Sequence, residues 1–143
     1  MKDWKESLSE FFEETEKDRQ AKKEPELTRF MARVVVPAFR EIAAEMEAHG
    51  REVTIRQTDT SAAIVITFDG DEEIRYRVQG RTFPHTVLPY AEIRYRERKG
   101  LKLITVESML RSGPPDYTLD DVSKEEVIRN FLEHYTRRVK GCN

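Results

Sequence analysis

Ile-Arg-Tyr-Arg-Val at residues 74–78 and Ile-Arg-Tyr-Arg at residues 93–96 repeat one pattern, in which apolar side chains alternate with arginines. Successive side chains of a β-strand point to opposite faces of a sheet, so this period of two separates the two residue types. The two segments therefore predict an antiparallel sheet with arginines on one face and with tyrosines and isoleucines on the other. The arginines expected to share that face are Arg75, Arg77, Arg94 and Arg96.

Turn residues divide the middle of the chain into five segments that favour strands. We expect these strands at residues 51–57, 62–68, 73–78, 91–98 and 101–106. Asp69-Gly70 and Lys99-Gly100 have the chemistry of tight hairpin turns. A two-residue turn at Lys99-Gly100 would pair Tyr95 with Ile104. Strands that follow one another through short turns favour an antiparallel meander.

Two registers compete at the Asp69-Gly70 hairpin, and they differ in which residues share a face with the arginines. A two-residue turn pairs Arg75 with Ile64, which adds the isoleucines of strand 62–68 to the arginine face. A three-residue loop pairs Tyr76 with Ile64 instead and leaves the arginine face more polar. Because turn chemistry prefers two residues and strand 62–68 is apolar on both sides, we expect the first register.

Segments with helical periodicity precede and follow the expected strands. Residues 3–23 predict a charged helix, and residues 26–49 a second helix that is kinked at Pro37. Pro25 suits the first turn of that second helix. The last helix begins at Ser123, where Ser-x-x-Glu forms a capping box. Its expected buried stripe is Val127, Ile128, Phe131, Leu132, Tyr135 and Val139, and the apolar stripe of the first helix is Trp4, Leu8, Phe11 and Phe12.

These elements predict the α+β class, with an antiparallel meander of four to five strands packed on the kinked helix and the C-terminal helix. At 143 residues, one domain is the default. We expect a charged N-terminal helical arm at residues 1–24 and a single α+β domain at residues 25–143. The arm would dock on the domain or on a second subunit.

The composition limits the classes of partner. The formal net charge is −2, and residues 51–98 hold eight basic and eight acidic side chains, so no strong basic excess points to nucleic acid. The single Cys142 excludes an internal disulfide and a multi-cysteine metal site. The apolar stretch at residues 34–39 is too short to cross a bilayer, and no secretory signal is evident. We therefore expect a cytoplasmic protein with no membrane partner.

No residue spacing matches a catalytic or metal-binding motif. His49, His85 and His134 do not stand at metal-ligand spacing, and the sequence has neither a phosphate loop nor a nucleophile elbow. We therefore assign no catalytic residue, no metal ligand and no cofactor, and we expect a protein that is not an enzyme. His85 is the most interesting of the histidines, because it lies in a connection between two prolines.

The arginine face favours a small interaction module that self-associates as a dimer or binds another protein, through that face or through the arm. Arg is enriched and Lys is depleted at protein interfaces, and residues 51–98 contain no Lys. The competing interpretation is a solvated face whose arginines pair with neighbouring glutamates.

An alternative is a small-molecule or enzymatic pocket, formed by the connections at residues 80–89 and 108–121, that takes a small anionic ligand. Its expected rim is Arg81, His85, Arg111 and Tyr117. Nucleic-acid binding ranks last, because Tyr76 and Tyr95 should lie on the face opposite the arginines, where no base can stack on them.

Overall fold

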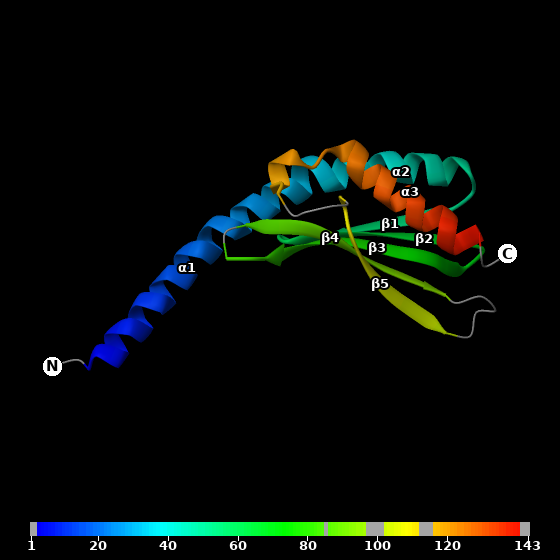
Figure 1. The fold of residues 1–143 in the computed structure, drawn as a ribbon. Coiled ribbons are helices and arrows are strands. Elements are labelled where there is room, and N and C mark those ends of the chain that lie inside the picture. Colours follow the sequence, from blue (N-terminus) through cyan, green and yellow to red (C-terminus); the bar gives the residue numbers. More distant parts are fainter. Residues whose placement is uncertain (1–2, 85, 97–101, 112–115, 141–143) are drawn as a thin grey trace.

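The computed structural model describes residues 3–84, 86–96, 102–111 and 116–140, and for residues 14–24 and 140 it describes the backbone alone. Helices precede and follow five consecutive strands (Figure 1). In chain order the elements are α1 (Trp4–Phe30), the π-helical turn η1 (Met31–Val35), α2 (Val36–Ala48), β1 (Glu52–Gln57), β2 (Ser61–Phe68), β3 (Asp71–Thr82), β4 (Val87–Arg96), β5 (Leu103–Met109), the 3-10 turn η2 (Leu119–Asp121) and α3 (Lys124–Lys140).

The strands form one antiparallel sheet in the order β1-β2-β3-β4-β5, and this confirms the α+β meander. Figure 1 shows α2 and α3 on one face of this sheet, with α1 leaving it at one end. Within the described part of the chain, no helix covers the opposite face. The register expected for the β4–β5 hairpin is confirmed, since Tyr95 lies opposite Ile104.

The core lies between the helices and the covered face of the sheet. Tyr76 stands at its centre, fully buried, and makes edge-to-face contacts with Phe39 of α2 and Phe131 of α3. Its hydroxyl donates a 2.6 Å hydrogen bond to Oδ1 of Asn130. One side chain of β3 therefore joins both helices to the sheet.

The turn of the β2–β3 hairpin has the chemistry that the sequence predicts. Asp69 and Gly70 have φ angles of 53° and 85°, and the flanking residues Phe68 and Asp71 pair across the turn. Positive φ at both central residues is what a tight two-residue turn requires, and Asp-Gly is a favoured sequence for it.

Beyond that turn, a β-bulge gives a register different from the one we expected. Thr67 pairs with Glu72 but Ile66 pairs with Ile74, so Glu73 is the extra residue. Ile64 consequently lies opposite Tyr76. The expected pairing of Ile64 with an arginine was wrong, and the alternative register is the correct one. The isoleucines of β2 thus face the helices, where they are fully buried.

The kink in the helical N-terminal half is a π-helical turn that directly precedes Pro37. Proline lacks an N–H, and its ring clashes with the carbonyl four residues earlier. The wider π-turn relieves this clash, and the N–H of Val36 bonds to the carbonyl of Met31. The helix boundary expected near Pro25 was wrong, because α1 runs through it. The buried Leu27 holds the rest of α1 in the same helical register against the sheet.

Strands β3 and β4 pair further than we expected. Their ladder extends to the pair Thr82 and Val87, so most of the expected connection at residues 80–89 is strand. Pro89 lies inside β4, although proline cannot donate to a ladder. It is tolerated because the pairing of β5 with β4 stops at Tyr90, which leaves one side of β4 unpaired there.

Helix α3 starts as the capping box predicts. The Glu126 N–H donates to the Ser123 hydroxyl, and the Ser123 N–H donates to the Glu126 carboxylate at 3.5 Å. Val127 and Phe131 are fully buried, as expected. The expected burial of Leu132 was wrong, because it is 44% exposed one residue beyond Phe131 on the helix.

The buried hydroxyls of two tyrosines provide a matched test of this core. Tyr76→Phe leaves Oδ1 of Asn130 without its donor and should lower the free energy of unfolding by about 1–3 kcal/mol. The Tyr117 hydroxyl is buried and has no hydrogen-bond partner among the described residues, so Tyr117→Phe should be neutral or stabilising. Urea unfolding of both variants measures the contrast, and equal losses of stability would contradict it.

Candidate protein-interaction surface

Arg75, Arg77, Arg94 and Arg96 lie on one face of the sheet. Arg75 pairs directly with Arg94, and the other two arginines alternate with core residues on the same strands. We call this side of the sheet, which no described helix covers, the Arg face. It carries Glu52, Thr54, Arg56, Ser61, Ala63, Val65, Thr67, Glu72, Arg75, Arg77, Gln79, Arg81, Leu88, Tyr90, Glu92, Arg94, Arg96, Leu103, Thr105, Glu107 and Met109.

Two arginines of the Arg face are neutralised by glutamates of other strands, one on the adjacent strand and one two strands away. Arg94 donates two hydrogen bonds to Glu72, with a shortest distance of 2.8 Å between nitrogen and oxygen. Arg81 forms a 2.7 Å ion pair with Glu107. In both cases the bond to the carboxylate raises the pKa of the guanidinium. These two arginines therefore match the interpretation of a solvated, paired face.

Arg75 and Arg77 differ from these two. Neither has a carboxylate within ion-pair distance among the residues that the structure describes. Burial lowers the pKa of Arg75, and the nearby charges of Arg77 and Arg94 lower it further. The Nε of Arg77 is buried and finds no hydrogen-bond partner. Like charges directly opposite each other destabilise a sheet. An electron-rich group placed against Arg75 and Arg77 would reduce this repulsion, so this part of the face is suited to a partner that carries such a group.

Arg56 of β1 also has no carboxylate within ion-pair distance among the described residues. It lies opposite Ala63, which in turn lies opposite Arg77, so the three residues form one row across the sheet. In the next row Val65 lies opposite Arg75. We call Arg56, Arg75 and Arg77 the unpaired arginine cluster. Ala63 and Val65 of β2 lie between its members, and Ala63 is buried.

Tyr90 is an aromatic side chain on the Arg face that we did not single out from the sequence. It pairs with Gln79 and Met109, and the guanidinium carbon of Arg81 lies 4.4 Å from its ring centre. Tyr90 lies two residues before Glu92 and therefore on the same face of β4. The sequence would have placed Tyr90 on the Arg face if the expected strand had begun before residue 91.

The residues expected at a pocket rim are only partly brought together. Arg111 covers the ring of the buried Tyr117 at 4.7 Å and forms a 2.7 Å ion pair with Glu126. This pair lowers the pKa of the Glu126 carboxyl. Arg81 lies apart from them on the Arg face, and His85 lies outside the described residues. We thus find Arg111 and Tyr117 in a structural contact between a strand end and α3.

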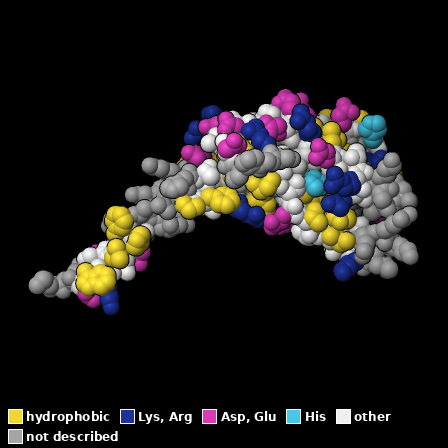
Figure 2. All heavy atoms as spheres, viewed as in Figure 1, with side chains coloured by type: hydrophobic (Ala, Val, Ile, Leu, Met, Phe, Trp, Pro, Cys, Tyr) yellow, Lys and Arg dark blue, Asp and Glu magenta, His cyan; other side chains and the backbone are white. Residues whose placement is uncertain are grey.

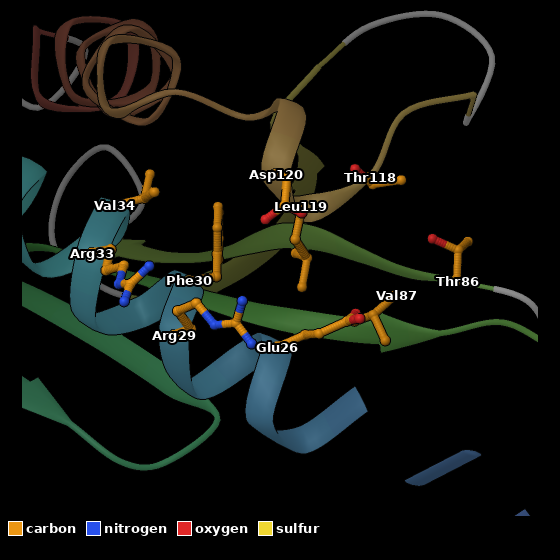
Figure 3. Close-up of a pocket in the computed structure, with 10 residues that line it drawn as sticks. All are labelled: Glu26, Arg29, Phe30, Arg33, Val34, Thr86, Val87, Thr118, Leu119 and Asp120. Carbon is orange, nitrogen blue, oxygen red and sulfur yellow. The ribbon is translucent and has the colours of Figure 1, made fainter. Parts of the chain in front are cut away.

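A cavity of about 340 Å³ does lie where the two expected connections meet. Figure 3 shows Phe30 and Leu119 projecting into it, with arginines on the wall formed by α1 and η1. Its lining is Glu26, Arg29, Phe30, Arg33, Val34, Thr86, Val87, Thr118, Leu119 and Asp120. The β4 and η2 ends of the two connections are therefore neighbours, although none of the four expected rim residues is among the described lining.

The apolar stripe of α1 is exposed. The exposed fractions are 69% for Trp4, 47% for Leu8, 60% for Phe11 and 60% for Phe12. Figure 1 shows this end of α1 projecting from the body, and Figure 2 shows the hydrophobic side chains gathered on it. Of the expected arm at residues 1–24, the structure describes the side chains of residues 3–13, and from here on the name arm refers to residues 3–13 alone. Large aromatic side chains in this arrangement are typical of a surface that binds another protein.

Comparison of the chain with protein-family models, with curated proteins and with solved structures finds no match. No group of side chains in the described residues could hold a metal ion. Among the helices described above, none is both long and apolar enough to span a membrane.

The contrast between Arg75 and Arg94 can be measured in the isolated chain. Arg75→Gln removes one of two like charges that face each other without an ion pair of its own, so it should raise the free energy of unfolding by up to about 1 kcal/mol. Arg94→Gln also breaks the ion pair with Glu72 and should be neutral or destabilising. Chemical denaturation of both variants measures this difference. A loss of stability in Arg75→Gln would contradict it.

Proposed function

We propose that this chain is a non-enzymatic, cytoplasmic interaction module that self-associates. The observation that carries the proposal is the exposure of four large apolar side chains on the arm. Burying each of them fully would contribute roughly 1.5–3 kcal/mol. An isolated helix end gains nothing by exposing such residues to water, so a protein surface that covers them is the simplest reason for their presence.

The charged groups of the structure support a binding role over a catalytic one. The clearest pKa shifts in the described residues belong to ion pairs, to core tyrosines and to the buried His134. None of these groups belongs to the described lining of the 340 Å³ cavity. In enzymes, the residues with shifted pKa values usually lie together in one cleft.

Light scattering coupled to size exclusion tests self-association. The wild-type chain should elute at a mass near twice 16.8 kDa over a concentration series, and Leu8→Glu/Phe12→Glu should elute as a monomer. The control is Leu132→Glu, which places the same charge on an exposed apolar residue of α3 and should leave the mass unchanged. A wild-type chain that is monomeric at every concentration would contradict the proposal.

A second candidate function is binding of a small carboxylate or phosphate compound in the cavity between α1 and η2. Arg29 and Arg33 are one helical turn apart on its wall, and neither has an ion pair in the described structure. The hydroxyls of Thr86 and Thr118 lie on the opposite side (Figure 3). Guanidinium and hydroxyl donors around an apolar floor are suited to a small anion.

Thermal denaturation with added citrate or inorganic phosphate tests this second candidate. An anion at 100 times its dissociation constant adds about 2.7 kcal/mol to the stability of the chain that binds it. The wild-type chain should therefore be stabilised, whereas Arg29→Ala/Arg33→Ala should not respond. Arg40→Ala, on the exposed side of α2, is the matched control. Equal stabilisation of all three proteins would count against the cavity as a binding site.

A further inference from the structure

We propose that the arm of one copy docks on the Arg face of a second copy, with its aromatic side chains over the unpaired arginine cluster. This inference rests on the proposed self-association and specifies its geometry. It makes the contact one between two different surfaces, rather than between two arms or between two sheets.

The chemistry of the contact is one that this chain already uses within its own fold. Four arginines lie over aromatic rings, at 4.1–4.8 Å from guanidinium carbon to ring centre. The pairs are Arg51 over Phe68, Arg81 over Tyr90, Arg111 over Tyr117 and Arg138 over Tyr95. A guanidinium group is attracted to the face of an aromatic ring, most strongly to Trp. Trp4 and Phe12 offer such rings on the arm, and Arg75 and Arg77 offer guanidinium groups that lie over no ring of the described residues.

The net charges of the two surfaces are opposite. The arm contains one lysine and four acidic residues, a net charge of −3. The Arg face contains six arginines and four glutamates, a net charge of +2. Opposite net charges speed the encounter of two surfaces and disfavour alternatives that bring like charges together. Two arms, or two Arg faces, would repel each other.

The dimensions of the two surfaces also match. The stripe from Trp4 to Phe12 spans eight residues of helix, or about 12 Å. The unpaired arginine cluster reaches from β1 to β3, which are separated by two strand spacings, or about 10 Å. An arm that lies across the strands can therefore place its first and last aromatic side chains over the unpaired arginine cluster. Between the arginines, the half-buried Val65 provides a small apolar position.

The continuity of α1 excludes the same contact within one chain. α1 is a single helix of 27 residues, about 40 Å long. Near its C-terminal end Leu27 packs on the helix-covered face of the sheet, so closely that a Cβ at Gly80 would lie 2.5 Å from the Leu27 side chain. The arm would have to break α1 to reach the Arg face of its own sheet. The Arg face it meets therefore belongs to another copy.

Mixing two defective variants tests this geometry. The face variant is Arg75→Glu/Arg77→Glu, with an intact arm, and the arm variant is Trp4→Ala/Phe12→Ala, with an intact face. Each alone should associate at least tenfold more weakly than the wild-type chain. A mixture of the two should form a species of twice 16.8 kDa, because the arm of the first can dock on the face of the second. Sedimentation velocity over a concentration series measures this.

The controls separate this inference from the proposed self-association. Arg40→Glu/Arg129→Glu reverses two exposed charges on the helices and should associate as the wild-type chain does. If the wild-type chain associates, the arm variant is defective and the face variant is not, the arms bind each other and the docking geometry is wrong. If both variants are defective and the mixture stays monomeric, the geometry is also wrong. Far-ultraviolet circular dichroism of each variant checks that it folds.

Discussion

The β-bulge at Glu73 is the constraint on which both faces of the sheet depend. Without it, the two-residue turn would place the isoleucines of β2 beside the arginines of β3. Each isoleucine left exposed would forfeit roughly 1.5–3 kcal/mol of burial, which exceeds the preference for any one turn type. With the bulge, Asp69 and Gly70 keep their favoured turn, Ile64 and Ile66 face the helices, and the guanidinium groups of β3 face outward.

The sequence predicts the faces of this fold better than its boundaries. Alternation in β3 and β4, the capping box of α3 and the kink before Pro37 follow from local chemistry, and each is found in the structure. The bulge arises because the chain satisfies both the two-residue turn at Asp69-Gly70 and the burial of the β2 isoleucines. Neither requirement alone predicts it. The place of Pro89 within β4 depends on where the pairing of β5 with β4 ends. The continuation of α1 through Pro25 depends on packing against the sheet, which the local sequence does not reveal.

The candidate site is predictable to the same extent. Alternation alone places four arginines on one face, but it does not separate Arg94, which Glu72 neutralises, from Arg75, which has no such partner. That difference arises across strands, from the register that the bulge sets. Arg56 joins the surface through the same register, whereas Tyr90 joins it through its position in β4, two residues before Glu92. The cavity at η2 likewise requires two connections distant in the sequence to meet, and the sequence does not place its arginines there.

A sheet that pairs Arg75 with Arg94 gives up stability that a neutral side chain would return. In the contact that we propose, an aromatic ring of a second copy would lie over Arg75 and offset this loss. The exposed aromatic side chains of the arm present the complementary problem, since they are apolar groups that the single chain leaves in water. The contact between copies that we propose would resolve both, because each surface supplies the group that the other lacks: an electron-rich ring for the guanidinium, and a partly buried surface for the ring.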